Sequence, residues 1–137
     1  MANALYDSAR ESFLSGNLDW LTDNIKVVLV EGYTPDTATH DFLDDVTGAG
    51  GGTIAATSGN FANKTATAGV ADADDVTLSE VPAGDPCDHL VIYKDTGTDS
   101  TSDLIAVIDT ATGLPLTPNG GDVTIQWDEG ANKIFKL

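Results

Sequence analysis

Two apolar segments separated by a polar one dominate the C-terminal half of the chain. Leu90–Tyr93 and Leu104–Ile108 contain only apolar residues and are rich in β-branched ones, whereas residues 95–103 are all polar or glycine. Two such runs joined by turn-forming residues predict a β-hairpin. Because both runs are apolar on both faces, we expect the hairpin at the centre of the fold, covered on each side.

The same periodicity predicts one amphipathic helix near the N-terminus. Leu5, Ala9 and Phe13 recur every four residues and therefore share one helical face. We expect Asn3 to cap this helix, which should continue to about Leu14 before glycine and asparagine end it.

Further strands are expected on both sides of the hairpin. Ile25–Val30 has five apolar residues out of six, which predicts a strand buried on both faces. In 123–128, apolar and polar residues alternate strictly, which is typical of a strand with one buried face. Weaker patterns predict strands at 53–57, 64–70, 76–79 and 132–137, and a short helix capped by Thr39 at 39–46.

These elements together favour a mainly β fold. About eight short strands with regularly spaced turn signals, after a single helix, are typical of an antiparallel β-sandwich, and we expect a jelly-roll-like one with an N-terminal α-helix. The length fits one domain over residues 1–137, with residues 1–16 as a helical arm and residues 24–137 as the sandwich.

Charge narrows the classes of partner. Six basic against 22 acidic side chains give a net charge of −16, far beyond the roughly 2–8 units usual for a small domain. Such a surface repels phosphate backbones and anionic lipids, so we expect neither nucleic-acid nor membrane binding. No apolar run is long enough to span a bilayer, and the acid-containing N-terminus is unlike a signal peptide. We therefore expect synthesis in a reducing cytoplasm.

The chain has few residues of the kinds that carry catalysis. We therefore do not expect the protein to be an enzyme, and we expect neither catalytic residues nor a cofactor. Cys87 is the single cysteine, which excludes a disulfide within the chain, and His40 and His89 are the two histidines. No serine lies in a G-x-S-x-G motif. Glycines in 48–52 lack the lysine and the flanking elements of a phosphate-binding loop, so a flexible surface loop is expected there.

Two weaker signals concern binding. Asp72, Asp74 and Asp75 are close in sequence but do not match the spacing of a calcium loop, so we expect a solvated turn and no metal site, with a weak calcium site as the alternative. Trp20, Tyr33 and Phe42 fall in or beside irregular segments. Aromatic side chains in such places are either interface residues or parts of a satellite core, and we take these three as candidates for contact with a partner.

Several longer motifs then suggest a relationship. These are residues 3–16 (NALYDSARESFLSG) leading into Trp20, residues 109–115 (DTATGLP), residues 118–122 (PNGGD) and a terminal segment, 127–135, that begins WD and ends NKIF. Across nearly the whole chain, this pattern resembles a family of small virion proteins of tailed bacteriophages, encoded among head genes. The motifs are structural rather than catalytic.

The resemblance implies a role as well as a fold. It implies a jelly-roll-like homo-oligomer that binds the major capsid protein on the outside of the head as a decoration or cement protein. Its location would be the capsid exterior of the virion, after synthesis in the bacterial host cytoplasm. Two alternatives stay open: an accessory structural protein of the tail or baseplate, and a calcium- or glycan-binding module.

Overall fold

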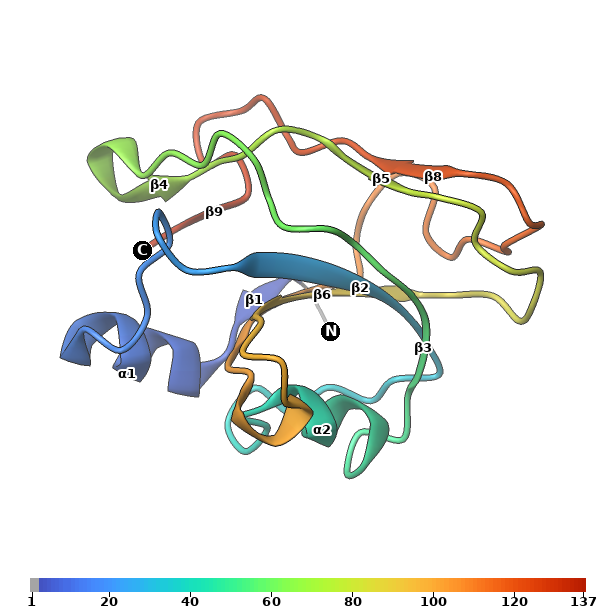
Figure 1. The fold of residues 1–137 in the computed structure, drawn as a ribbon, viewed down its shortest axis with the longest axis horizontal. Coiled ribbons are helices and arrows are strands. Elements are labelled where there is room, and N and C mark those ends of the chain that lie inside the picture. The colour runs from blue at the N-terminus through green and yellow to red at the C-terminus, as the bar shows by residue number, and fades with distance from the viewer. Residues whose placement is uncertain (1–2) are drawn as a thin grey trace.

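The computed structural model describes residues 3–137 and shows a mainly β protein (Figure 1). Its largest element is a five-stranded, fully antiparallel sheet with the strand order β1-β7-β6-β2-β3, here called the main sheet. In chain order its strands are β1 (Ala4–Leu5), β2 (Ile25–Glu31), β3 (Thr53–Thr57), β6 (His89–Lys94) and β7 (Leu104–Ile108).

The central hairpin predicted from the apolar runs is confirmed. Strands β6 and β7 pair in antiparallel register, with Val91 opposite Val107, and the polar segment between them includes a short 3-10 helix, η2 (Asp99–Thr101). Strand β2 pairs with β6 along six residues. Nearly every residue of β2 and β6 is buried, because a second layer covers each face of the main sheet. The prediction of strands buried on both faces is therefore also confirmed.

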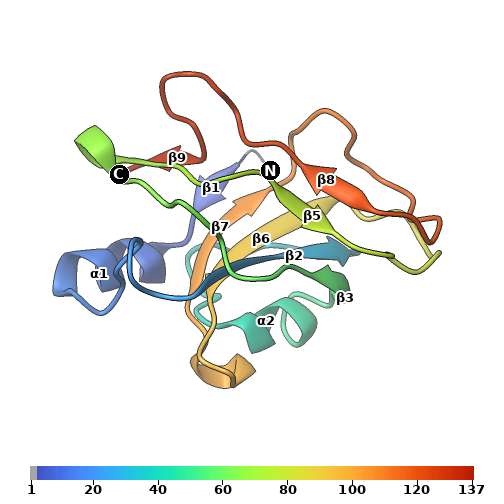
Figure 2. The same cartoon turned by 45° about the horizontal axis from the view of Figure 1, so that its top comes forward.

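A long two-stranded ribbon covers one face of the main sheet (Figures 1 and 2). Segment 70–87 runs antiparallel to segment 116–136, and the two meet in three places. These places are β4 (Val70–Ala71) with β9 (Phe135–Lys136), β5 (Val76–Leu78) with β8 (Val123–Ile125), and a bridge between Cys87 and Leu116. We call this element the covering ribbon. Its inward residues Ile125 and Trp127 are buried, while Thr124 and Gln126 are exposed, as the alternation predicts.

Helices occupy the other side and one end of the main sheet. Helix α2 (Leu43–Thr47) lies on the face opposite the covering ribbon, and helix α1 (Asp7–Ser15) packs beside the end of β7 (Figure 1). Ala9 of α1 is fully buried. The helix ends at Gly16, which adopts a left-handed conformation with φ of 79°, as a glycine after a helix commonly does.

The predicted start of the first helix is wrong. Asn3 does not cap α1, which begins at Asp7; instead Ala4 and Leu5 form β1 at the edge of the main sheet. The Asn3 carboxamide binds the chain beyond β7, where its Oδ1 accepts hydrogen bonds from the amides of Asp109 and Thr110 at 2.9 and 3.0 Å. Pairing with β7 satisfies backbone groups that a longer helix would leave to water.

Two other predicted elements need correction. Helix α2 begins at Leu43 and not after Thr39; the Asp45 carboxylate accepts from the amide of Asp41 at 2.8 Å and so fixes the helix start. Segment 64–70 is not a strand. Ala68 and the glycine after it have positive φ within the 3-10 helix η1 (Thr67–Gly69), which reverses the chain so that residues 65 and 72 pair.

Candidate functional site

An apolar groove of about 310 Å³ lies at one end of the molecule, between the C-terminal half of α1, the loop that follows it, and β9. Its apolar walls are formed by Phe13, Leu18, Trp20, Leu21, Phe135 and Leu137. Leu21 and Leu137 are 52% and 58% exposed, and Leu14, next to Phe13 in α1, is 90% exposed. These are the large exposed hydrophobic side chains of residues 3–137; Leu21 and Leu137 line the groove, and Leu14 directly follows Phe13, which also lines it.

Trp20, one of the candidate interface residues, forms the rigid floor of this groove. Its ring packs edge-on against Phe135 and Phe61, with centroid distances of 5.2 and 5.9 Å, and its Nε1 donates a hydrogen bond to the carbonyl of Asp72 at 3.3 Å. The side chain is only 5% exposed. Trp20 therefore supports the exposed leucines rather than projecting from the surface itself.

The groove end also differs from the rest of the molecule in charge. The residues that line it fall within three segments, 7–23, 64–72 and 133–137, and we count Lys94 with these segments because its ammonium bonds the carbonyl of Asn17 and pairs with Asp23. Together they hold five of the six basic side chains and five acidic ones. The remaining one basic and 17 acidic side chains therefore carry the whole net charge of −16.

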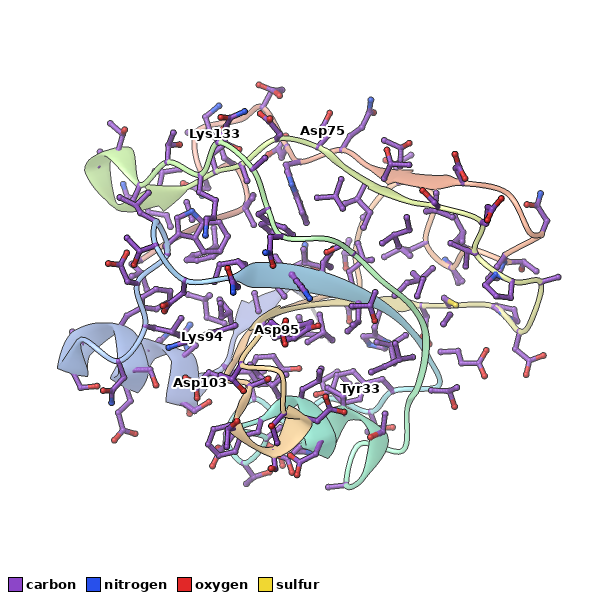
Figure 3. All side chains as sticks on the ribbon, in the orientation of Figure 1. Tyr33, Asp75, Lys94, Asp95, Asp103 and Lys133 are labelled. Atoms are coloured by element: carbon purple, nitrogen blue, oxygen red, sulfur yellow. The ribbon has the colours of Figure 1, made fainter. Side chains whose placement is uncertain are left out.

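Tyr33, the second candidate, lies in a buried hydrogen-bond chain beneath the main sheet, beside α2 (Figure 3). Its hydroxyl is 2.6 Å from the hydroxyl of Tyr6 and 2.9 Å from Nδ1 of His40. The backbone amide of Asp36 also donates to this Nδ1, at 3.3 Å. An amide can only donate, so Nδ1 is an acceptor and Tyr33 must donate to it. Tyr6 in turn donates to Tyr33.

Both tyrosines of this hydrogen-bond chain are shielded from solvent. Tyr6 is fully buried and Tyr33 is 3% exposed. Burial raises the pKa of the Tyr6 and Tyr33 hydroxyls above the ordinary value, so both stay protonated and serve as hydrogen-bond donors. The ring of Tyr33 also stacks on His40 and meets His89 edge-on. Tyr33 thus fastens the loop before α2 to the N-terminal segment.

The glycine cluster belongs to the same region and is the expected surface loop only in part, since Gly48, Ala49 and Gly51 are exposed and the other two residues are not. Gly50 and Gly52 are buried. A Cβ atom at Gly50 would overlap the ring of Tyr33, and one at Gly52 would lie 2.8 Å from Cγ1 of Val30. The amide of Thr34 donates to the carbonyl of Gly50 at 2.9 Å. These glycines therefore let two backbone segments close around the Tyr33 ring.

Phe42, the third candidate, is half-buried and lies apart from the groove. It precedes α2 and forms an isolated bridge with Asp103, next to the polar end of the β6–β7 hairpin. The three aromatic candidates thus occupy three places: the groove floor, the buried cluster under the main sheet, and the border of α2. Of the three, Trp20 lines the apolar groove.

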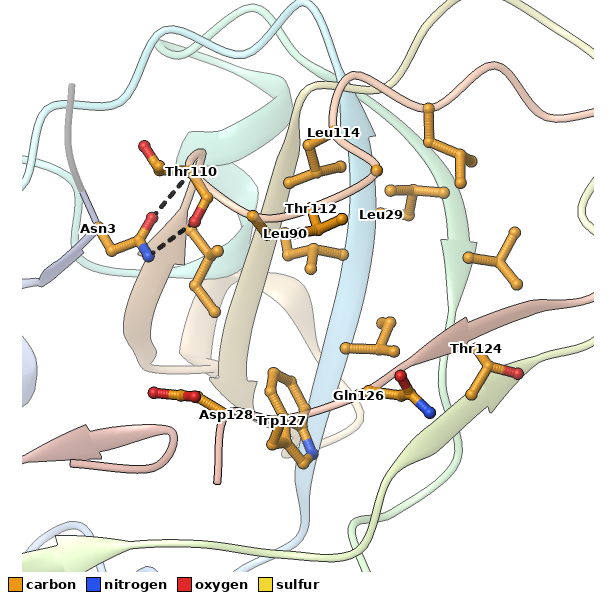
Figure 4. Close-up of a pocket in the computed structure, with 16 residues that line it drawn as sticks. Asn3, Leu29, Leu90, Thr110, Thr112, Leu114, Thr124, Gln126, Trp127 and Asp128 are labelled. Atoms are coloured by element: carbon orange, nitrogen blue, oxygen red, sulfur yellow. Dashed lines mark hydrogen bonds between the residues drawn. The ribbon is translucent and has the colours of Figure 1, made fainter. Parts of the chain in front are cut away.

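A second hollow, the interlayer cavity, lies between the main sheet and the covering ribbon (Figure 4). Its volume is about 500 Å³. Leu29 and Leu90 of the main sheet form its floor, Ile125 and Trp127 of the covering ribbon form its roof, and the loop after β7 closes one side with Leu114. Sequence patterning identified the inward face of 123–127 but gave no sign that a space remained beneath it.

The acidic turn is tied to the protein by its carboxylates. Asp72 pairs with Lys133 at 3.7 Å, Asp74 accepts from Asn63 at 2.6 Å, and Asp75 accepts from the amide of Trp127 at 3.0 Å. The three side chains bind three different partners, and across residues 3–137 no group of three or more histidine, cysteine or carboxylate side chains is placed to hold a metal ion. The arrangement holds the covering ribbon in register.

Comparison with known proteins adds no relative, since no protein-family model and no curated protein matches this chain. Within the described part of the chain, no helix is long and apolar enough to cross a membrane.

Proposed function

We propose that this protein is a structural virion protein that decorates the outer surface of a tailed-phage head and cements its shell, docking through the groove end. The observation that carries the proposal is the segregation of its surface. The large exposed apolar side chains gather at one end whose charges balance, while the rest of the molecule holds the net charge of −16. The motif resemblance to small phage head proteins supports the same role.

Such a surface meets the two physical requirements of a decoration protein. Free copies must stay soluble at high concentration, and a strongly acidic skin keeps them apart. Bound copies must bury apolar surface on the shell, and each Å² removed from water contributes about 25 cal/mol. Because the groove end is close to neutral, it can approach the major capsid protein without the repulsion that the acidic faces would meet. Binding to assembled shells and not to loose subunits then favours assembly.

The finer description of the fold is part of this proposal. The covering ribbon stacked on the main sheet supports a two-layered, jelly-roll-like sandwich. A homo-oligomer on the shell would bring the acidic faces of neighbouring copies together unless they met near the neutral end. We therefore expect any self-association to use surfaces adjoining the groove.

Co-sedimentation with undecorated mature shells tests the docking surface. The purified protein should bind saturably, and Leu21→Asp should weaken binding about tenfold or more, because it places a carboxylate where an apolar side chain is buried. Ala83→Asp adds the same charge on an exposed loop of the covering ribbon, away from the groove, and should bind like the wild type. Absence of binding at both low and physiological salt, or equal weakening by the two variants, would contradict the proposal.

The tail or baseplate role is the second candidate, because a two-layered β protein with one apolar end would serve there equally well. Labelling of intact virions distinguishes the two: signal on tails with bare heads favours the second candidate. A glycan- or calcium-binding role has less support, since the Asp72–Asp75 carboxylates are engaged within the protein. Calorimetry with calcium and a glycan array would reveal it.

A further inference from the structure

The interlayer cavity is large for a protein of this size. It is a partly open pocket and not a sealed void, because Thr112, Gly113 and Gln126 in its lining are exposed. At about 500 Å³ this cavity falls within the range of ligand-binding pockets, roughly 300–1,000 Å³. An engineered apolar cavity of about 150 Å³ in another protein already binds benzene. The interlayer cavity is therefore spacious enough for a molecule considerably larger than benzene.

The walls define what such a molecule would be. Leu29 and Leu90 from the main sheet are 1% and 6% exposed, and Ile125 and Trp127 from the covering ribbon are 7% exposed. Leu114 and Leu116 complete the apolar lining from the loop after β7. Water in contact with such walls gains few hydrogen bonds, so an apolar occupant would displace it favourably.

Several polar residues around the cavity are directed elsewhere or already engaged, and Thr112 of the loop after β7 adds a neutral hydroxyl to the lining. The Asn3 carboxamide binds the backbone of residues 109 and 110 (Figure 4), and the hydroxyl of Thr110 donates to the Asp109 carboxylate. Thr124 and Gln126 lie on the exposed side of their strand. No lysine or arginine lines the cavity, and the charged residue at its border is Asp128. The site thus has nothing to neutralise an anion.

We propose that the interlayer cavity binds a small, uncharged, predominantly apolar molecule, aliphatic or aromatic, with Trp127 and Leu90 in contact with it. The inference is independent of the docking role assigned to the groove end. Occupancy would replace missing contacts between the two layers and so raise the stability of the folded state by mass action.

Fluorescence titration of the full chain with N-phenyl-1-naphthylamine, an uncharged aromatic probe, tests the proposal. We expect saturable binding of one molecule per chain. Decanol should displace the probe, whereas decanoate, with a chain of the same length and a carboxylate, should not. Leu114→Trp fills the cavity from its side wall and should weaken binding at least tenfold. Leu21→Trp places the same side chain in the apolar groove and serves as the matched control.

Three results of this titration would contradict binding in the interlayer cavity. Absence of saturable binding, displacement by decanoate as effective as by decanol, or loss of binding in Leu21→Trp with retention in Leu114→Trp would overturn the proposal. If Leu114→Trp fails to fold, an NMR titration of the wild-type protein with the probe locates the binding site instead. Probe-induced amide shifts at Leu90 and Ile125, with none at Phe13 and Leu21, support the interlayer cavity, and the reverse pattern contradicts it.

Discussion

The buried tyrosine pair allows a sharp test because the direction of its hydrogen bonds follows from the structure. The Asp36 amide fixes Nδ1 of His40 as an acceptor, Tyr33 donates to it, and Tyr6 donates to Tyr33. Tyr33→Phe removes the central hydroxyl and leaves the Tyr6 hydroxyl, on a fully buried residue, without an acceptor. Tyr6→Phe removes only the first donor, and Tyr33 keeps its bond to His40.

The two substitutions should therefore differ in cost. A typical hydrogen bond contributes about 1 kcal/mol, and an unsatisfied buried donor costs about 1–3 kcal/mol. We expect Tyr33→Phe to lower the free energy of unfolding by about 2–4 kcal/mol and Tyr6→Phe by about 1 kcal/mol. The double variant should cost less than the sum of the two, because the orphaned hydroxyl is gone.

Equilibrium unfolding in urea measures these free energies, with an unchanged slope as the check that compactness is preserved. Tyr93→Phe is the control: Tyr93 is 3% exposed, and its hydroxyl lies outside the hydrogen-bond chain of Tyr6, Tyr33 and His40. It should change stability by less than about 0.5 kcal/mol. A Tyr6→Phe cost equal to that of Tyr33→Phe, or strict additivity in the double variant, would refute the directed chain.

Three further predictions concern stability. The Ser8 hydroxyl is buried without a partner in the described chain, so Ser8→Ala should raise the free energy of unfolding by about 0.5–1 kcal/mol in the same urea assay; a loss would contradict this. Burial raises the pKa of Asp103, so the folded state binds its proton more tightly and this group stabilises the fold as pH falls through the raised pKa. Asp103→Asn should make the free energy of unfolding less dependent on pH around the raised pKa, and an unchanged dependence would contradict this prediction. Added sodium chloride should raise the melting temperature by screening the net charge of −16, whereas a falling temperature would show that attraction between charges dominates.

The central part of the fold is predictable because it depends on local patterns. The runs at 90–93 and 104–108 are apolar enough to require burial on both faces, and the alternation at 123–127 fixes an inward side. The predictions of short elements were wrong where contacts between distant residues determine the structure. Asn3 has the chemistry of a helix cap, but the sheet edge beside β7 offers its carboxamide two backbone amides.

The candidate site was harder to predict because distant segments create it. The apolar groove joins Phe13 and Leu21 to Leu137, more than a hundred residues later, and no periodicity links them. Leucines beside aromatic residues, at 14 after Phe13 and at 21 after Trp20, were a usable signal, as was the pair of lysines near the C-terminus. Tyr33 is buried because Gly50 and Gly52 close around its ring, a contact that its own neighbours in sequence do not reveal.

A cryo-microscopy map of the intact virion tests the proposed role most directly. Decoration of the head predicts density for this chain on the outer capsid surface, with Leu14, Leu21 and Leu137 facing the shell and the α2 side and the β5–β8 part of the covering ribbon facing solvent. Density confined to the tail, or copies that contact the shell through an acidic face with these leucines exposed, would contradict it.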